Sequence, residues 1–236
     1  MKKTPKISSL IDKAIFDYNL IESGDKILIG ASGGKDSTVL IEYFASRTKR
    51  PDCNFEYKAV HIHSDFASPF PEDIMNLLKK WDASFESIDV NILERVKENQ
   101  KMSCYWCSTQ RRSELLNYAL EHGYNKIALG HHMDDILETF LMNMLEKGNL
   151  STMIPKMQYE KWPVSIIRPL AYISENRIIE HAKDKGFYGY TCTCNFQDNS
   201  TRKEARKRLE LLTGGDEKTK ERMFRALKNV QIEYLL

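Results

Sequence analysis

The chain has 236 residues, of which 42% are hydrophobic and 29% are charged, and its formal net charge is +2. This length and composition fit one substantial globular domain with room for a small appendage. No stretch approaches the roughly 20 apolar residues of a membrane span, and the first residues lack the apolar core of a signal peptide, so we expect a cytoplasmic protein without membrane association. Because the net charge is small, any affinity for nucleic acid must come from a local basic patch.

Helical and extended segments alternate along most of the chain. In chain order, the spacing of apolar residues predicts a helix over about 8–22, a strand over 26–31, a helix over 38–44, a strand over 56–63, a helix over 71–81, a strand over 85–90, a helix over 108–122, a strand over 126–130, a helix over 134–145, a strand over 163–167 and a helix over 174–185. This alternation indicates an α/β fold, a Rossmann-like, doubly wound, parallel five-stranded sheet.

Two segments of different character follow from this pattern. Residues 1–190 carry all of the predicted strands and are expected to form the catalytic domain. Residues 191–236 are polar and helical without a strand, so we expect a short helical C-terminal extension there rather than an independent core.

A glycine-rich turn follows the first predicted strand. The residues Ser32-Gly33-Gly34-Lys35-Asp36-Ser37 stand between this strand and the next helix. Backbone N–H groups freed by the two glycines, together with the positive end of the helix, make an anion cradle. The motif is not the nucleotide-triphosphate loop with four residues between its glycines. It resembles the pyrophosphatase-type loop (PP-loop) of enzymes that split ATP between its α- and β-phosphates and adenylate a substrate.

A second polar motif follows the fourth predicted strand. Asp134 and Asp135 begin a helix there, so they either hold Mg²⁺ between phosphates or serve only as an acidic helix start. In doubly wound sheets ligands bind beyond the carboxyl ends of the strands, so this motif and the PP-loop should converge. Of the two preceding histidines, we expect His131 to pack at the strand end with a bond to backbone, and His132 to face solvent.

The five cysteines form two pairs and a single. Cys53 stands alone as an incidental thiol, whereas Cys104 and Cys107 form one pair and Cys192 and Cys194 another. In a reducing compartment such pairs suggest metal or sulfur chemistry. Four thiolates could hold a structural zinc, three could hold an iron–sulfur cluster with one iron left open, and a pair could carry a persulfide without metal.

Several motifs in this order resemble those of the tRNA 2-thiocytidine synthetase family and its relative, the tRNA 2-thiouridine synthetase. They are the PP-loop, Cys104-x-x-Cys107 followed by Arg111-Arg112, Ala128-Leu129-Gly130-His131-His132 with Asp134-Asp135, and Arg168-Pro169-Leu170-Ala171-Tyr172. The resemblance covers about residues 14–234. It implies the adenine-nucleotide α-hydrolase fold and activation of a pyrimidine C2 oxygen by ATP and Mg²⁺. It also implies replacement of that oxygen by sulfur, with a [4Fe–4S] cluster on three cysteines.

The resemblance assigns roles to residues of this chain. Cys104, Cys107 and Cys194 would hold the cluster, with Cys192 as the alternative third ligand because Cys192-Thr193-Cys194 is one residue shorter than the family's pair. Lys35, Asp36 and Asp135 would be catalytic. ATP would be bound by Gly30, Ala31, Ser32, Gly33, Gly34, Lys35, Asp36, Ser37, Ile62, His63, Arg111, Gly130 and Asp135. Mg²⁺ would be held by Asp36 and Asp135, together with Asp134.

The partners implied are tRNA and either sulfide or a sulfur-donor protein, with a homodimer as a further possibility. Arg202, Lys203, Arg206 and Lys207 belong to a run with five basic groups in seven residues, which would contact RNA phosphates or form a solvated helix surface.

The residues by themselves support ATP binding beside a cysteine cluster, and together with the resemblance they leave three functions to compare. The first is a cluster-dependent tRNA sulfurtransferase. The second is another adenylating tRNA-modifying enzyme of the PP-loop type that uses a different nucleophile. The third is a non-enzymatic RNA-binding protein with a structural zinc site on four cysteines.

Overall fold

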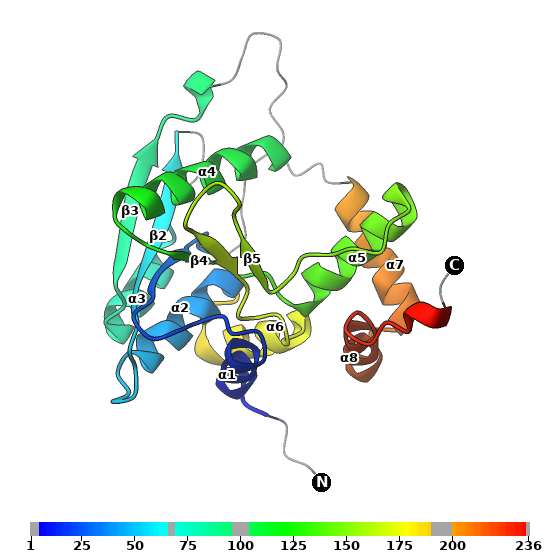
Figure 1. Cartoon of the computed structure of the whole chain (residues 1–236). Coiled ribbons are helices and arrows are strands. Elements are labelled where there is room, and N and C mark those ends of the chain that lie inside the picture. Colours follow the sequence, from blue (N-terminus) through cyan, green and yellow to red (C-terminus); the bar gives the residue numbers. More distant parts are fainter. Residues whose placement is uncertain (1–4, 66–68, 96–103, 190–199, 235–236) are drawn as a thin grey trace.

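The structure is a computed structural model that describes residues 5–65, 69–95, 104–189 and 200–234. Its centre is a six-stranded sheet with the order β3-β2-β1-β4-β6-β5 (Figure 1). The strands are β1 Lys26–Gly30, β2 Glu56–Ser64, β3 Phe85–Val90, β4 Lys126–Ala128, β5 Lys156–Gln158 and β6 Ser165–Ile167. Five of them are parallel, as the sequence predicted, and β5 adds an antiparallel edge strand that the sequence did not predict.

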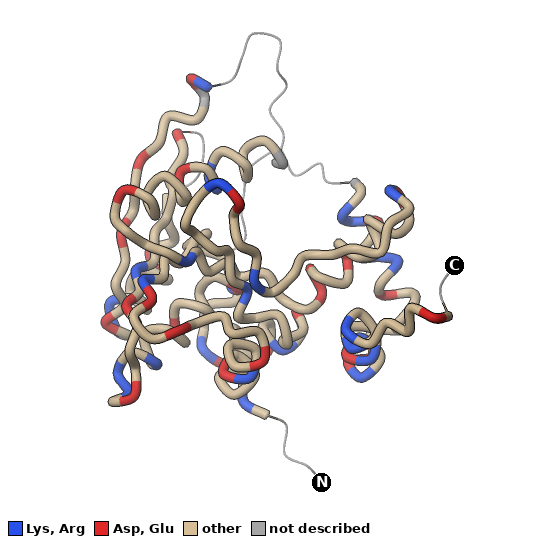
Figure 2. The backbone as a smooth tube through the Cα atoms, viewed as in Figure 1, with Lys and Arg blue, Asp and Glu red and all other residues tan. Residues whose placement is uncertain are grey.

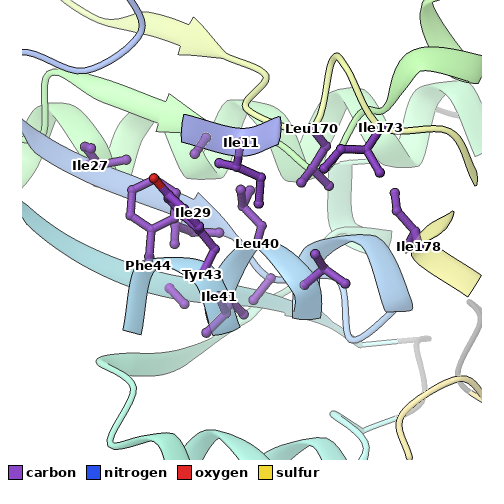
Figure 3. Close-up of a cluster of buried hydrophobic side chains, with 14 of the residues drawn as sticks. Ile11, Ile27, Ile29, Leu40, Ile41, Tyr43, Phe44, Leu170, Ile173 and Ile178 are labelled. Carbon is purple, nitrogen blue, oxygen red and sulfur yellow. The ribbon is translucent and has the colours of Figure 1, made fainter. Parts of the chain in front are cut away.

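Helices cover both faces of this sheet. They are α1 Ile7–Asp17, α2 Lys35–Arg47, α3 Glu72–Trp81, α4 Cys104–Glu121, α5 Met133–Lys147, α6 Glu175–Lys185, α7 Ser200–Thr213 and α8 Glu217–Ala226, with short 3₁₀ turns at Leu93–Arg95 and Ile232–Tyr234. The first core cluster joins α1, α2, α3 and α6 to one face of the sheet, and Figure 3 shows part of it around Ile29 and Leu40. The second joins α4 to the opposite face through residues such as Leu28 and Leu115.

This division of the core follows from the alternation of side chains along a strand. In β1, Ile27 and Ile29 belong to the first cluster and Leu28 to the second. All three side chains are fully buried. A central strand covered on both faces therefore reads as a continuous apolar run, which is the pattern that made β1 recognisable in the sequence.

The order of the strands creates a crevice between β1 and β4. From β1 the chain passes to β2 and β3 on one side, and it then returns to β4 on the other side of β1. The strand order therefore reverses between β1 and β4, and in sheets of this kind ligands bind at the carboxyl ends of the strands at that point. The PP-loop follows β1 there, and Gly130 follows β4.

The helices α7 and α8 pack on α5, beside the sheet domain (Figure 1). Leu209 of α7 and Phe224 of α8 are buried in a third cluster with Leu137 of α5. These two helices are the extension that the sequence predicted, and their apolar contacts are shared with the sheet domain. None of the helices in the described ranges has the length and apolarity that crossing a bilayer requires.

Candidate nucleotide and metal site

The PP-loop is held in shape by its own hydroxyl groups. The helix α2 begins inside the loop at Lys35, three residues earlier than predicted, with Gly34 as its N-cap. Gly33 has a φ of +79°, a left-handed conformation that costs glycine little. The Ser37 hydroxyl donates to the Gly34 carbonyl at 3.0 Å and accepts the Ser32 backbone N–H at 3.2 Å. The N-terminus of α2 is thereby fixed at the crevice, where it favours an anion.

The end of β4 lies directly against this loop. A Cβ on Gly130 would stand 3.0 Å from the Ser37 backbone nitrogen and 3.1 Å from the Asp36 carbonyl carbon. A side chain at this position would push the PP-loop backbone away by a few tenths of an ångström. Gly130 therefore sets the distance between the PP-loop and the start of α5.

A pocket of about 230 Å³ opens beside the loop. It brings together five of the predicted ATP-binding residues, namely Gly30, Ala31, Ser32, Ile62 and Arg111. Ser108, Arg112 and Leu115 of α4 and His131 complete much of its wall. The side chain of His63 does not line it and instead lies with its Nδ1 2.8 Å from Oδ1 of Asp89.

Two carboxylates meet at the junction of α2 and α5, on either side of a buried histidine. His132 Nε2 lies 3.4 Å from Asp135 Oδ2 and 3.9 Å from Asp36 Oδ1. The Asp135 carboxylate also accepts the His132 backbone N–H at 3.1 Å, which caps α5. His132 is 3% exposed, so the prediction that it faces solvent is wrong. The reason is the PP-loop, which places Asp36 next to His132 although the two residues are far apart in the sequence.

His131 also differs from its expectation. Its Nδ1 accepts a hydrogen bond from Nε of the buried Arg168 at 3.3 Å, rather than bonding to backbone, and its ring lines the pocket. Burial lowers the pKa of His131 to about 4, because the charged form loses its hydration. His131 is therefore neutral near pH 7.

The two carboxylates differ in their electrostatics. Burial raises the pKa of Asp36 above its usual range. Burial acts in the same direction on Asp135, but the charges of His132 and Arg202 outweigh it, and the pKa of Asp135 is lowered. Oδ1 of Asp36 is buried without a hydrogen-bond partner among the described residues. Such an oxygen next to a second carboxylate fits a Mg²⁺ ion that takes its remaining ligands from phosphates and water.

Asp134 does not belong to this pair. Its Oδ1 lies 2.8 Å from Nζ of Lys220, and its Oδ2 accepts the Glu175 backbone N–H at 2.8 Å. Both charged side chains are nearly inaccessible, at 5% and 6% exposure. These contacts of Asp134 join α5, α6 and α8. Its expected role as a Mg²⁺ ligand stays a prediction.

Lys35 is held by two carboxylates at the start of α2. Its Nζ lies 3.1 Å from Asp36 Oδ2 and 3.0 Å from Glu175 Oε1. Burial acts to lower the pKa of Lys35, but these two charges raise it, so the ammonium group stays charged. Glu175 was not predicted as a site residue, although it is the first residue of α6, the helix after β6, and so lies at the same edge of the sheet as the PP-loop.

The basic run on α7 divides into two faces. Arg202 NH2 lies 3.3 Å from Asp135 Oδ1, and Arg206 Nε lies 2.8 Å from Glu138 Oε1. Lys203 and Lys207 are exposed. The two arginines of the predicted tRNA-binding set therefore turn toward the acids of the site, while the two lysines turn toward solvent.

The first cysteine pair begins α4, which starts at Cys104 rather than at residue 108. Cys107 is buried, and its neighbour Ser108 lines the pocket. The second pair, Cys192 and Cys194, lies outside the described residues. Within the described ranges no three His, Cys, Asp or Glu side chains are grouped as a metal site. Cys53 precedes β2, at the end of the sheet opposite the PP-loop, in agreement with an incidental thiol.

The fold and the site define an ATP-binding protein of the PP-loop class, and the family model of the PP-loop domain matches residues 4–211. The chain is 36% identical over 230 residues to the tRNA-cytidine(32) 2-sulfurtransferase 1 of Francisella tularensis subsp. tularensis (strain WY96-3418), covering 95% of this chain and 85% of the relative. It is 38% identical over 235 residues to the tRNA-cytidine(32) 2-sulfurtransferase of Variovorax paradoxus (strain S110), covering 96% and 74%. This chain belongs to the PP-loop family and, within it, to the tRNA-cytidine(32) 2-sulfurtransferases.

Solved structures that share the fold cover nearly the whole chain, and one of them is a tRNA thiolase. It is the U34-tRNA thiolase NcsA from Methanococcus maripaludis with its [4Fe-4S] cluster, with a TM-score of 0.77 at 19% identity, covering 98% of this chain and 80% of that one. The resemblance to tRNA thiolation enzymes is confirmed by the family. Among the three functions left open by the residues, family membership supports the first.

Proposed function

We propose that this chain is an ATP-dependent tRNA sulfurtransferase that replaces the C2 oxygen of a cytidine with sulfur. The observation that carries the proposal is that the PP-loop and the helix turn next to Cys107 lie beside the same pocket. Ser32 of the PP-loop, Ser108 next to Cys107, and His131 next to the buried His132 line one pocket at the switch point of the sheet. His132 in turn lies between Asp36 and Asp135. A nucleotide and a thiolate-bound group could both reach a base presented there.

ATP would lie with its base and ribose in the pocket and its phosphates at the N-terminus of α2. The adenine would contact the backbone of Ile62, and the phosphates the backbone of the PP-loop. Lys35 and Arg111 would offset the negative charge that develops on the leaving pyrophosphate. Asp36 and Asp135 would hold Mg²⁺.

The chemistry proceeds in two displacements. In the first, the C2 oxygen of the base attacks the α-phosphorus, the bond to the β-phosphate oxygen breaks, and pyrophosphate leaves. In the second, a sulfur nucleophile adds to C2, the C2–O bond breaks, and AMP leaves with the oxygen. The target base must be taken out of its stack, because C2 is inaccessible within a helix. Neutral His131 at the pocket wall is suited to hydrogen-bond the flipped base without repelling the cations around it.

The cysteines fit a [4Fe–4S] cluster, held by Cys104, Cys107 and Cys194, with Cys192 as the alternative third ligand. Three thiolates leave one iron able to hold sulfur. The sulfur would come from sulfide or a sulfur-donor protein in the cytoplasm. Lys203 and Lys207, on the exposed face of α7, would contact tRNA phosphates. A second copy of the chain could complete the tRNA-binding surface.

Reconstitution tests this function. We expect anaerobically prepared protein to be brown and, with ATP, Mg²⁺, sulfide and unmodified tRNA, to release AMP and form 2-thiocytidine, measured by mass spectrometry of tRNA nucleosides. Asp36→Ala should lose both products, while Glu121→Ala, exposed at the end of α4, should retain them. Release of AMP without sulfur in tRNA would indicate another adenylating reaction. A colourless protein with one bound zinc would contradict the cluster.

A further inference from the structure

A row of alternating charges connects α7 to the PP-loop. It starts at Lys35, which pairs with Oε1 of Glu175. The other carboxylate oxygen, Oε2 of Glu175, lies 3.5 Å from NH2 of Arg206. Arg206 and Arg202 both pair with Glu138, at 2.8 and 3.4 Å. Arg202 then reaches Asp135 at 3.3 Å. Figure 2 shows that both acidic and basic positions occur where α5 and α7 lie.

Glu138 is the buried member of this row, with 1% of its side chain exposed, whereas Arg202 and Arg206 are 38% and 54% exposed. The two guanidinium groups offset the cost of burying the Glu138 carboxylate. Glu138 therefore attracts the Arg202 side chain toward the same end of the site as Asp135.

Arg202 and Mg²⁺ would compete for the same carboxylate. Oδ1 of Asp135 lies 3.3 Å from NH2 of Arg202, and Oδ2 of Asp135 accepts the His132 backbone N–H. A metal on Asp135 would repel the guanidinium group of Arg202, which then gains from another anion within reach.

The anion available there is the triphosphate itself. We propose that Arg202 is a nucleotide-binding residue that neutralises Asp135 in the empty site and transfers to a β- or γ-phosphate oxygen when Mg²⁺ and ATP bind. This inference rests on the proposed function and adds a residue from α7 to its ATP site. Guanidinium groups suit the step because their fixed fork of five donors can bind Glu138 and a phosphate together. It also explains how an extension outside the sheet domain can respond to the nucleotide.

The proposal makes two predictions of opposite sign for Arg202→Gln. Affinity for Mg²⁺·ATP should fall roughly 10- to 100-fold, as expected for loss of a charged hydrogen bond, while affinity for AMP stays within about 2-fold because AMP lacks the β- and γ-phosphates. Affinity for Mn²⁺ alone should rise, because Asp135 loses its competing cation. Calorimetry measures the nucleotides, and electron paramagnetic resonance measures free Mn²⁺.

A matched control lies on the same helix. Arg208 has the same exposed fraction, 38%, but pairs only with Glu204 one turn earlier among the described ion pairs. Arg208→Gln should change none of the three affinities. Arg202→Lys serves as a second variant if Arg202→Gln fails to fold. It keeps the positive charge without the guanidinium fork, so we expect it to fold and to lose part of the ATP affinity.

Two outcomes would overturn the proposal. If Arg202→Gln or Arg202→Lys weakens AMP and ATP equally, Arg202 only supports the site. If ATP affinity is unchanged and Mn²⁺ affinity does not rise, the Arg202–Asp135 pair is merely a surface contact. Failure of the wild-type chain to bind ATP at all would instead contradict the proposed function.

Discussion

Removing the ammonium group of Lys220 should destabilise the protein strongly. Lys220→Met leaves the Asp134 carboxylate buried with the Glu175 backbone N–H and without its counter-ion. Breaking a buried ion pair from one side costs about 3–5 kcal/mol, because the remaining charge cannot regain water. For a chain of this size each kcal/mol lowers Tm by about 2–4 °C, so we expect a loss of roughly 6–20 °C.

Thermal unfolding followed by circular dichroism measures this loss. Lys218→Met, on the exposed side of the same helix, should change the free energy of unfolding by less than about 0.5 kcal/mol. Adding Asp134→Asn to Lys220→Met should recover most of the stability, because Asn keeps an acceptor for the Glu175 N–H without the charge. If Lys220→Met behaves like Lys218→Met, or if it changes Mn²⁺ affinity rather than Tm, then Asp134 is a metal ligand after all.

Three further predictions concern the site. Cys107→Ser should abolish the visible absorption of the reconstituted cluster and leave ATP affinity unchanged. Cys53→Ser should leave both the absorption and the ATP affinity unchanged. An unaltered spectrum in Cys107→Ser would exclude this thiol as a cluster ligand. Burial raises the pKa of Asp36, so the folded protein retains this proton to higher pH than the unfolded chain, and ionisation costs stability as pH rises between the two pKa values. Asp36→Asn should therefore raise Tm at neutral pH, change Tm little at a pH below the ordinary pKa of Asp, and abolish AMP release. An equal change in Tm at both pH values would argue that the cost does not come from a buried charge on Asp36. Gly130→Ala should weaken ATP binding, because its Cβ would press on Asp36 and Ser37. Gly189→Ala should not, because its Cβ would meet nothing within 4 Å. Equal ATP affinities of the two variants would show that the PP-loop can shift at no cost.

Predictions from the sequence were most successful where the signal is local. The apolar run of β1 and the glycine-rich turn after it identify a strand, a loop and a helix within about a dozen residues. The parallel sheet follows from the repetition of that pattern, and the switch-point rule then places the loops after β1 and β4 together. Five of the predicted ATP-binding residues consequently line one pocket.

The sequence was insufficient where a residue's role depends on a distant partner. The edge strand β5 has only three residues, too few for an alternation of apolar residues to be recognised, so only its pairing with β6 defines it. His132 was expected in solvent because nothing near it in the chain shows that Asp36 covers it.

The sequence by itself determined the doubly wound fold, the PP-loop and the positions of the cysteines, because apolar periodicity and glycine turns act over a few residues. The tertiary structure alone decided which charges meet. Glu175 reaches Lys35 across 140 residues of sequence, and Lys220 reaches Asp134 across 86. Coulomb attraction depends on distance in space and on burial, and neither quantity is written in the order of the residues.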